Sequence, residues 1–250
     1  MPFLRSLLLL LALASPAFSQ IGSRDAATAQ NALRAFGLYL DGVAKSGGQP
    51  DFTKPPAADL LRHIFDVAAF NALPRAAASD MVWLPDWGAA VDLSYRRIIL
   101  YGRRLNEPSD LLMRRNMSKY QDQCAVAMSF MIRLQARQAT ALTSLEDQLP
   151  PEERRPAALQ QNRSDSAQTI TGAITAITQG MKPDNARLIA AALRDTRDVW
   201  AGYIMLDDRS RIAKLIADTP ATVKDREAQK NLTAFAGALA AAKEPTEIKP

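Results

Sequence analysis

Histidine and cysteine are almost absent from this sequence, which has one of each among its 250 residues. Most nucleophile–base pairs and zinc sites need more of these side chains than His63 and Cys124 can supply. The sequence also lacks a glycine-rich phosphate loop, a nucleophile elbow, an HExxH pair and a CxxCH haem motif. These absences favour a protein without enzymatic activity and without a bound cofactor, although carboxylates brought together by the fold could still perform acid–base chemistry.

Long apolar runs are also scarce, and the clearest one lies near the N-terminus at Leu7–Ala14. Its eight residues are too few for a membrane span, which needs about 20. The small residues Ala17 and Ser19 follow at the spacing that signal peptidase requires for a cut before Gln20. We therefore expect residues 1–19 to be a signal peptide and the mature protein to be periplasmic or secreted, soluble and without a transmembrane span.

The composition of the rest predicts one folded, all-α domain over residues 20–250. The chain is 48% hydrophobic and 23% charged, which is typical of a globular protein, and its formal net charge of +5 is too small to indicate nucleic-acid binding. Alanine, leucine, arginine and glutamine are common, whereas runs of β-branched and aromatic residues are rare. We expect an elongated bundle of about six to eight helices.

Apolar periodicity and the positions of Gly and Pro place these helices. The segment 46–56 is rich in Gly and Pro and should be an irregular loop, Pro85 should interrupt a further helical segment, and 244–250 should fray as a tail. The expected helical segments are 24–45, 57–73, 79–105, 109–149, 157–181, 184–218 and 220–243.

The segment 109–149 contains neither Gly nor Pro, so the sequence predicts one long central helix there, about 60 Å in length. A Met- and Cys-containing seam with steps of three and four residues resembles a coiled-coil pattern and begins at Met113. Residues 124–132 are apolar nearly all the way round, so other helices should enclose the middle of this helix. Sulfur ligands could bind Cu(I), but core packing explains the same residues.

Two clusters of polar residues are candidate sites. His63 lies between Asp59 and Asp66 at helical spacing, which suits either a metal or an ordinary surface pairing. Six arginines form a candidate anion-binding site, since guanidinium groups suit phosphate and carboxylate. Four of them, at 96, 97, 103 and 104, should form one basic ridge because residues seven apart return to the same helix face, and the turn at 106–108 should bring the other two near it. The alternative is a solvated helix face. The six are Arg96, Arg97, Arg103, Arg104, Arg114 and Arg115.

The sequence therefore leaves three classes of function open. The first is a non-enzymatic helical interaction or scaffold protein of the cell envelope, which should expose an apolar or mixed patch to its partner protein. The second is a binder of an anionic small molecule, lipid headgroup or acidic partner, through the arginine ridge or through a pocket between helices. The third is an enzyme that uses carboxylates, which should meet in a cleft.

Overall fold

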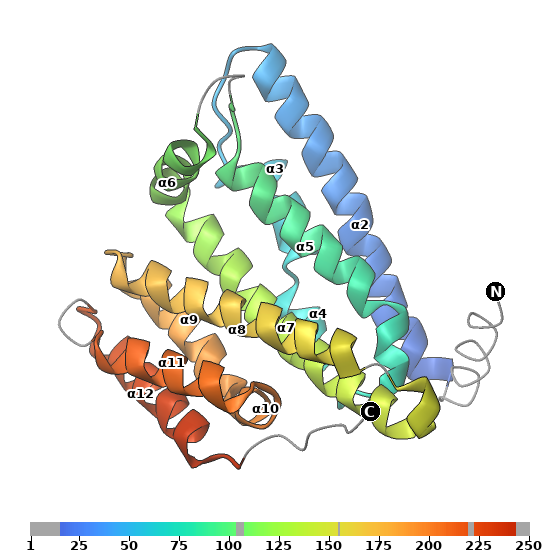
Figure 1. Cartoon of the computed structure of the whole chain (residues 1–250). Helices are drawn as coiled ribbons and strands as arrows, with labels where there is room; N and C mark the ends of the chain where they lie inside the picture. Colours follow the sequence, from blue (N-terminus) through green and yellow to red (C-terminus); the bar gives the residue numbers. More distant parts are fainter. Residues whose placement is uncertain (1–15, 104–107, 155, 220–222, 244–250) are drawn as a thin grey trace.

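The computed structural model describes residues 16–103, 108–154, 156–219 and 223–243, and this part of the chain is helical without β-strands (Figure 1). The all-α fold is thereby confirmed. The α-helices are α2 (Pro16–Lys45), α3 (Ala57–Ile64), α4 (Val67–Ala72), α5 (Leu84–Ile99), α6 (Ser109–Lys119), α7 (Gln121–Gln148), α8 (Pro156–Thr178), α9 (Pro183–Asp195), α10 (Arg197–Tyr203), α11 (Leu206–Ala217) and α12 (Arg226–Ala241). Two 3-10 helices accompany them, η1 (Ala78–Val82) and η2 (Pro151–Glu153).

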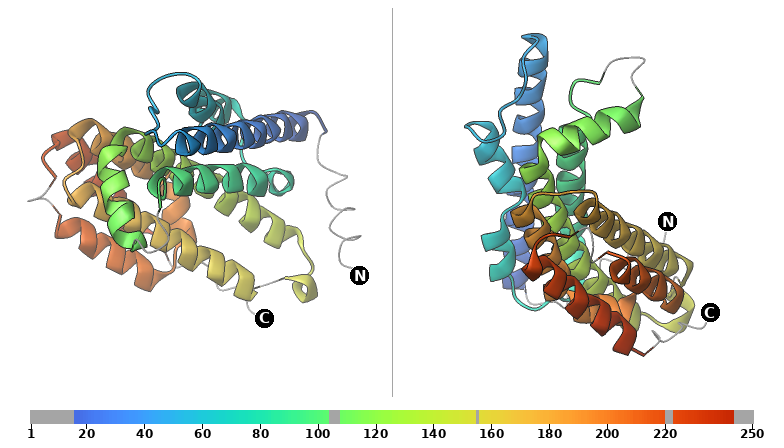
Figure 2. Two further views of the ribbon diagram at one scale, coloured as in Figure 1. Left: turned by 90° about the horizontal axis from the view of Figure 1, so that it is seen from above. Right: turned by 90° about the vertical axis from the view of Figure 1, so that its left-hand side faces the viewer.

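The N-terminal helices form one group around an aromatic core. In this group α2 packs against α3 and α5 (Figure 2). In addition, η1 and α5 pack against α7. Trp87 lies at the centre, where its ring is 5.5 Å from that of Phe130 and its indole N–H donates to the carbonyl of Ile64 at 2.9 Å. Since this buried N–H is paired, the large ring can fill the core without leaving a polar group unsatisfied.

The C-terminal helices form a second group, in which α9 lies between α7 and α12, and α11 packs against α8 and α12. Its core is built mainly from aliphatic side chains, with Ile174 and Ile189 fully buried beside Trp200 and Phe235. The indole N–H of Trp200 donates to the hydroxyl of Thr196 one turn earlier, at 2.8 Å. This group presents α8 and α11 side by side on the surface (Figures 1 and 2).

Helix α7 contributes to both cores. Phe130 and Leu134 face the N-terminal group, whereas Ala125 and Ile132 face the C-terminal group. This two-sided burial explains why the middle of α7 is apolar nearly all the way round. The enclosure is incomplete at Val126, which keeps 37% of its surface exposed.

The expected single helix over 109–149 is not confirmed, because the chain turns at Tyr120 between α6 and α7. The backbone of Tyr120 leaves helical geometry (φ −108°, ψ 37°), and its ring packs edge-on against Phe52 with 4.7 Å between centroids. The side-chain amide of Asn116 donates to the carbonyls of Ile99 and Tyr101, which lie at the end of α5. Tertiary contacts therefore fold α6 across the end of α5.

Other helices are divided as well, so the helices outnumber the six to eight that we expected. The segment 57–73 breaks before α4 because the carboxylate of Asp66 accepts the N–H of Ala69 and caps that helix. The final helix begins later than expected for the same reason, since Asp225 caps α12 through the N–H of Ala228. The expected interruption at Pro85 is confirmed, because Pro85 lies in the first turn of α5.

The segment 46–56 is irregular, as predicted. The hydroxyl of Tyr101 donates to the carbonyl of Gly48, and the side chain of Gln49 accepts from Lys119 and Tyr120. These contacts attach the loop to the end of α5 and to the turn between α6 and α7. At the N-terminus α2 already begins at Pro16, so the predicted cut before Gln20 falls inside this helix. Most of the predicted signal peptide (1–15) and the predicted tail (244–250) lie outside the described residues.

Candidate ligand-binding groove over α8

Helix α8 has two different faces. Ile170, Ile174 and Ile177 are buried in the second core. The opposite face carries small and polar residues at steps of three and four, which a helix places in one stripe. This stripe consists of Gln168, Thr171, Gly172, Thr175, Ala176 and Gln179, and it forms the floor of a surface groove.

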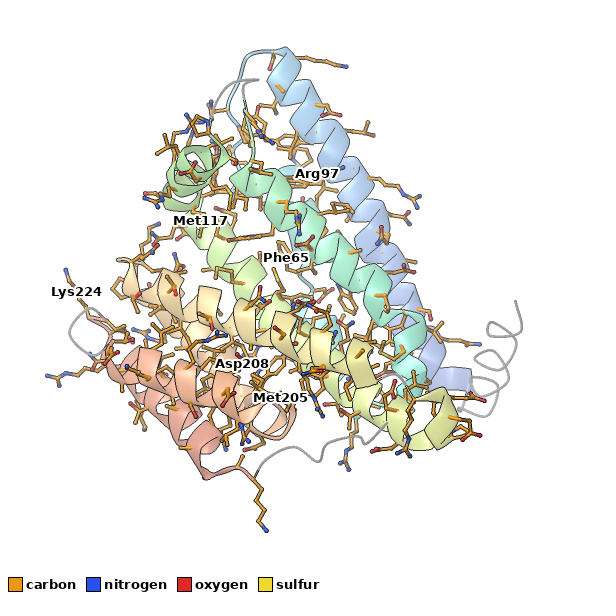
Figure 3. All side chains as sticks on the ribbon, viewed as in Figure 1. Phe65, Arg97, Met117, Met205, Asp208 and Lys224 are labelled. Carbon is orange, nitrogen blue, oxygen red and sulfur yellow. The ribbon has the colours of Figure 1, made fainter. Side chains whose placement is uncertain are left out.

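Residues from two other helices complete the groove. Met117 of α6 lines one side and Arg211 of α11 lines another, and the volume is about 530 Å³. This volume lies within the range of roughly 300–1,000 Å³ that is typical of small-molecule sites. In Figure 3, Met117 and Asp208, the latter one turn before Arg211 on α11, lie on opposite sides of the α8 ribbon. The groove therefore joins three helices that are distant in the sequence.

The floor of the groove is open at its centre. A Cβ atom placed on Gly172 would meet no atom of another helix within 4 Å, so a side chain or ligand atom at this point has open space. Ala176, one turn further along, adds only a methyl group. A ligand can therefore approach the backbone of α8 closely at this point.

Side-chain hydrogen-bonding groups surround this centre. The hydroxyls of Thr171 and Thr175 donate to backbone carbonyls of α8 at 2.8 Å, so they present acceptor lone pairs and methyl groups to the groove. Among the described residues, the side-chain amides of Gln168 and Gln179 have no hydrogen-bond partner. Gln168 and Gln179 are eleven positions apart, which corresponds to about 16.5 Å along the helix axis at 1.5 Å per residue.

Arg211 supplies the positive charge of the groove. Its side chain is 61% exposed and contacts the carboxylate of Asp208 with 2.7 Å between Nη2 and Oδ1. A guanidinium group has five N–H donors, and this single contact leaves most of them for a ligand. The groove thus combines a cation, free amides and an open floor.

The basic ridge that the sequence predicts on the third helical segment is not formed. Because α5 ends at Ile99, Arg103 lies beyond the helix and does not stack on Arg96. Arg96 pairs with Asp92 at 2.8 Å. Arg97 instead donates to the carbonyl of Leu33 on α2 at 2.8 Å.

Gly37 explains the position of Arg97, since a Cβ atom at this glycine would lie 2.4 Å from its guanidinium nitrogen. Arg104 lies outside the described residues. Arg114 and Arg115 are exposed on α6. Arg114 lies one turn before Met117, so it shares the face of α6 that lines the groove. Anion binding by the six arginines remains a prediction. Arg114 is the one of them that we place on the side of α6 nearest the groove.

The structure also places the other candidate residues. Asp59 pairs with Arg62 at 3.0 Å and Asp66 caps α4, so neither carboxylate is paired with the exposed His63. In the described part of the chain, no three His, Cys, Asp or Glu side chains are grouped so that they could hold a metal ion. Burial raises the pKa of the Cys124 thiol to about 12, so it stays protonated at neutral pH. Met113, Met117 and Met131 pack against the same core as Cys124, as expected for core residues.

One pair of carboxylates lies close enough to affect titration. The pKa of Asp25 is raised by burial and by the negative charge of Asp66. Asp66 already accepts the N–H of Ala69 as the cap of α4, which gives this carboxylate a structural role. Asp25 and Asp66 belong to the N-terminal group and are not among the residues that line the groove.

No protein-family model matches the chain, and neither the curated proteins nor the solved structures contain a significant match. Among the described residues, none of the helices is both long and apolar enough for a membrane span.

The polar stripe that forms the floor of this groove is present in the sequence but is not distinctive there. The residues at 168, 171, 172, 175, 176 and 179 repeat with helical period and oppose the isoleucine stripe of the same helix. A polar stripe is normally only the solvated face of a surface helix. The two walls of the groove come from α6 and α11, and the sequence alone could not place these helices beside α8.

Proposed function

We propose that this chain is an exported, non-enzymatic binding protein whose groove over α8 receives a small anionic ligand. The single observation that carries this proposal is the exposed guanidinium of Arg211 at the edge of a groove whose floor is open at Gly172. A carboxylate or phosphate group would pair with Arg211. The amides of Gln168 and Gln179 would bind the polar body of the ligand, and Met117 would contact its apolar part.

A small ligand is better supported than a large protein partner. The exposed large apolar side chains are distributed over many elements, and single exposed residues of this kind are normal on a protein surface. They are Ile21 and Leu38 on α2, Val67 on α4, Val82 on η1, Leu93 on α5, Leu111 on α6, Val126 on α7, Leu188 on α9 and Leu206 on α11. A scaffold function through one contiguous apolar patch has less support from this distribution.

Titration with matched charged and uncharged compounds tests the proposal. We expect sn-glycerol 3-phosphate and D-glucuronate to shift the backbone amide resonances of Gly172, Thr175 and Arg211 with saturation, whereas glycerol and D-glucose shift them much less. Because Arg211 is exposed, the affinity should fall as salt is raised from 20 to 200 mM. Equal shifts for the charged and uncharged compounds would overturn the proposal.

Gly172 allows the groove to be blocked without disturbing the fold. The change Gly172→Leu places a side chain in open space, and leucine favours a helix over glycine by up to about 1 kcal/mol, so the thermal stability should be unchanged or higher. Binding of sn-glycerol 3-phosphate should fall at least tenfold. Gly237→Leu is the matched control, because Gly237 is also an exposed helical glycine with open space around it, and this variant should bind normally.

Export of the protein is tested by the mass of the mature chain. Protein recovered from a secreting host should begin at Gln20, so that α2 loses its first residues, 16–19, and keeps the packing that begins at Gly22. Intact-mass spectrometry of the soluble fraction measures this directly. A product that retains Met1 and sediments with membranes would contradict both the cleavage and the proposed location.

A further inference from the structure

Arg211 already has an anionic partner within the protein. The carboxylate of Asp208 lies one turn earlier on α11 and contacts the guanidinium at 2.7 Å, and it is the less exposed partner, at 23% against 61%. Asp208 also lies in the first turn of α11, where the positive end of the helix dipole favours a negative charge. We therefore expect Asp208 to stay in place while the longer arginine side chain moves.

We propose that Asp208 sets the affinity of the groove by competing with the ligand for Arg211. This inference rests on the proposed function, because it assumes that an anion binds at Arg211. An incoming phosphate or carboxylate must either share the guanidinium with Asp208 or displace it. In both cases the ligand gains less from the guanidinium than it would if Arg211 were unpaired, so the site holds its ligand less tightly than Arg211 alone would.

Asp208 is therefore a positioning residue, because it acts on the affinity for the ligand through Arg211. Most substitutions in a binding site weaken binding, whereas Asp208→Asn should strengthen it. The ligand can gain from Arg211 only what the ion pair with Asp208 leaves available, and an exposed ion pair of this kind corresponds to at most roughly a fivefold change in affinity. The effect should shrink as salt is raised, since the charges are exposed.

Asp207 provides the matched control. It is exposed, lies in the same first turn of α11 and would lose the same unit of charge in Asp207→Asn. Asp207 lies four residues before Arg211 and is therefore also near it on the helix surface, but the carboxylate that contacts the guanidinium in the structure is that of Asp208. Asp207→Asn therefore tests the effect of a nearby charge that is not paired with Arg211. We expect Asp207→Asn to change the dissociation constant of sn-glycerol 3-phosphate by less than twofold.

The experiment measures the dissociation constants of sn-glycerol 3-phosphate and D-glucuronate by amide shift titration at 20 mM salt. Asp208→Asn should bind both compounds roughly fivefold more tightly than the unchanged protein. In an Arg211→Gln background, where binding is weak, the same change should have an effect below twofold, because Asp208 acts through Arg211. Thermal unfolding of each variant confirms that the fold is retained.

The possible outcomes separate this inference from the proposed function. In one outcome the unchanged protein binds the anions, Gly172→Leu abolishes binding, and Asp208→Asn leaves the affinity unchanged or weaker. The proposed competition by Asp208 is then wrong, whereas the proposed binding groove is supported. An Asp208→Asn effect of the same size in the Arg211→Gln background would also overturn the proposed competition, since direct repulsion would then explain the gain. If neither compound binds the unchanged protein or Asp208→Asn, both proposals fail.

Discussion

Replacing Arg209 with alanine should lower the free energy of unfolding by about 3–5 kcal/mol, because it removes a fully buried side chain and leaves two carbonyls without donors. Arg209 lies on α11 and is only 1% exposed. Its Nη1 donates to the carbonyl of Ala201 at 3.1 Å and to that of Ala242 at 2.8 Å. Within the described residues, no carboxylate forms an ion pair with Arg209.

The positions of the two acceptors explain how a guanidinium can be buried without a carboxylate. Ala201 lies in the last turn of α10, and Ala242 is the C-terminal cap of α12. Carbonyls at the ends of helices have no partner within the helix, and each helix C-terminus carries roughly half a negative charge. Nη1 of Arg209 therefore satisfies two orphan carbonyls and is stabilised by two helix dipoles, whereas its buried Nε and Nη2 have no hydrogen-bond partner among the described residues. It also holds the end of α12 against α10.

Urea unfolding of three variants separates packing from hydrogen bonding at this position. Arg209→Met keeps much of the volume but has no donors, so it should lose less stability than Arg209→Ala and still be less stable than the unchanged protein. Arg34→Ala on the exposed surface of α2 is the control and should change stability by no more than about 0.5 kcal/mol. A variant Arg209→Met that equals the unchanged protein in stability would mean that the desolvation of the guanidinium cancels its hydrogen bonds.

The sequence predicts the helical class and the breaks that Gly and Pro impose. The loop 46–56, the start of α5 near Pro85 and the end of α7 before Pro150 all follow from local conformational restrictions of these residues. The turn at Tyr120 has no such local signal. It depends on Phe52 and on the end of α5, which are brought there only by the complete fold. Breaks of this kind follow from tertiary packing, which apolar periodicity does not report.

The candidate site, like the fold, could be predicted from the sequence only in part. The sequence contains a dense set of arginines, and we expected the four at 96, 97, 103 and 104 to share one ridge because of their seven-residue spacing. That spacing has meaning only within one helix, and α5 ends four residues before Arg103. Arg97 is used instead to reach the backbone of α2. The arginine that lines the groove, Arg211, is paired with a carboxylate three residues earlier, which in the sequence is typical of an ordinary surface helix.

Removing the carboxylate of Asp80 should destabilise the protein by about 3–5 kcal/mol, because it leaves the charge of Arg137 buried without its partner. The two side chains are 8% and 10% exposed, and 2.6 Å separates Oδ2 of Asp80 from Nη2 of Arg137. The guanidinium also donates to the carbonyl of Pro74 at 2.8 Å and lies over the ring of Trp83 at 5.5 Å. These contacts attach η1 and the segment after α4 to α7.

A double-mutant cycle measures how much of this effect belongs to the pair. Asp80→Ala alone should be strongly destabilising, whereas Asp80→Ala combined with Arg137→Met should recover part of the loss, since the second change removes the unpaired charge. Asp92→Ala is the matched control: Asp92 pairs with Arg96 at 2.8 Å, but both side chains are largely exposed. Exposed pairs contribute at most about 1 kcal/mol, so Asp92→Ala should shift the urea midpoint only slightly. If Asp80→Ala and Asp92→Ala have equal effects, burial does not determine the strength of these pairs, and the attachment of η1 to α7 must depend on Trp83 and its apolar neighbours.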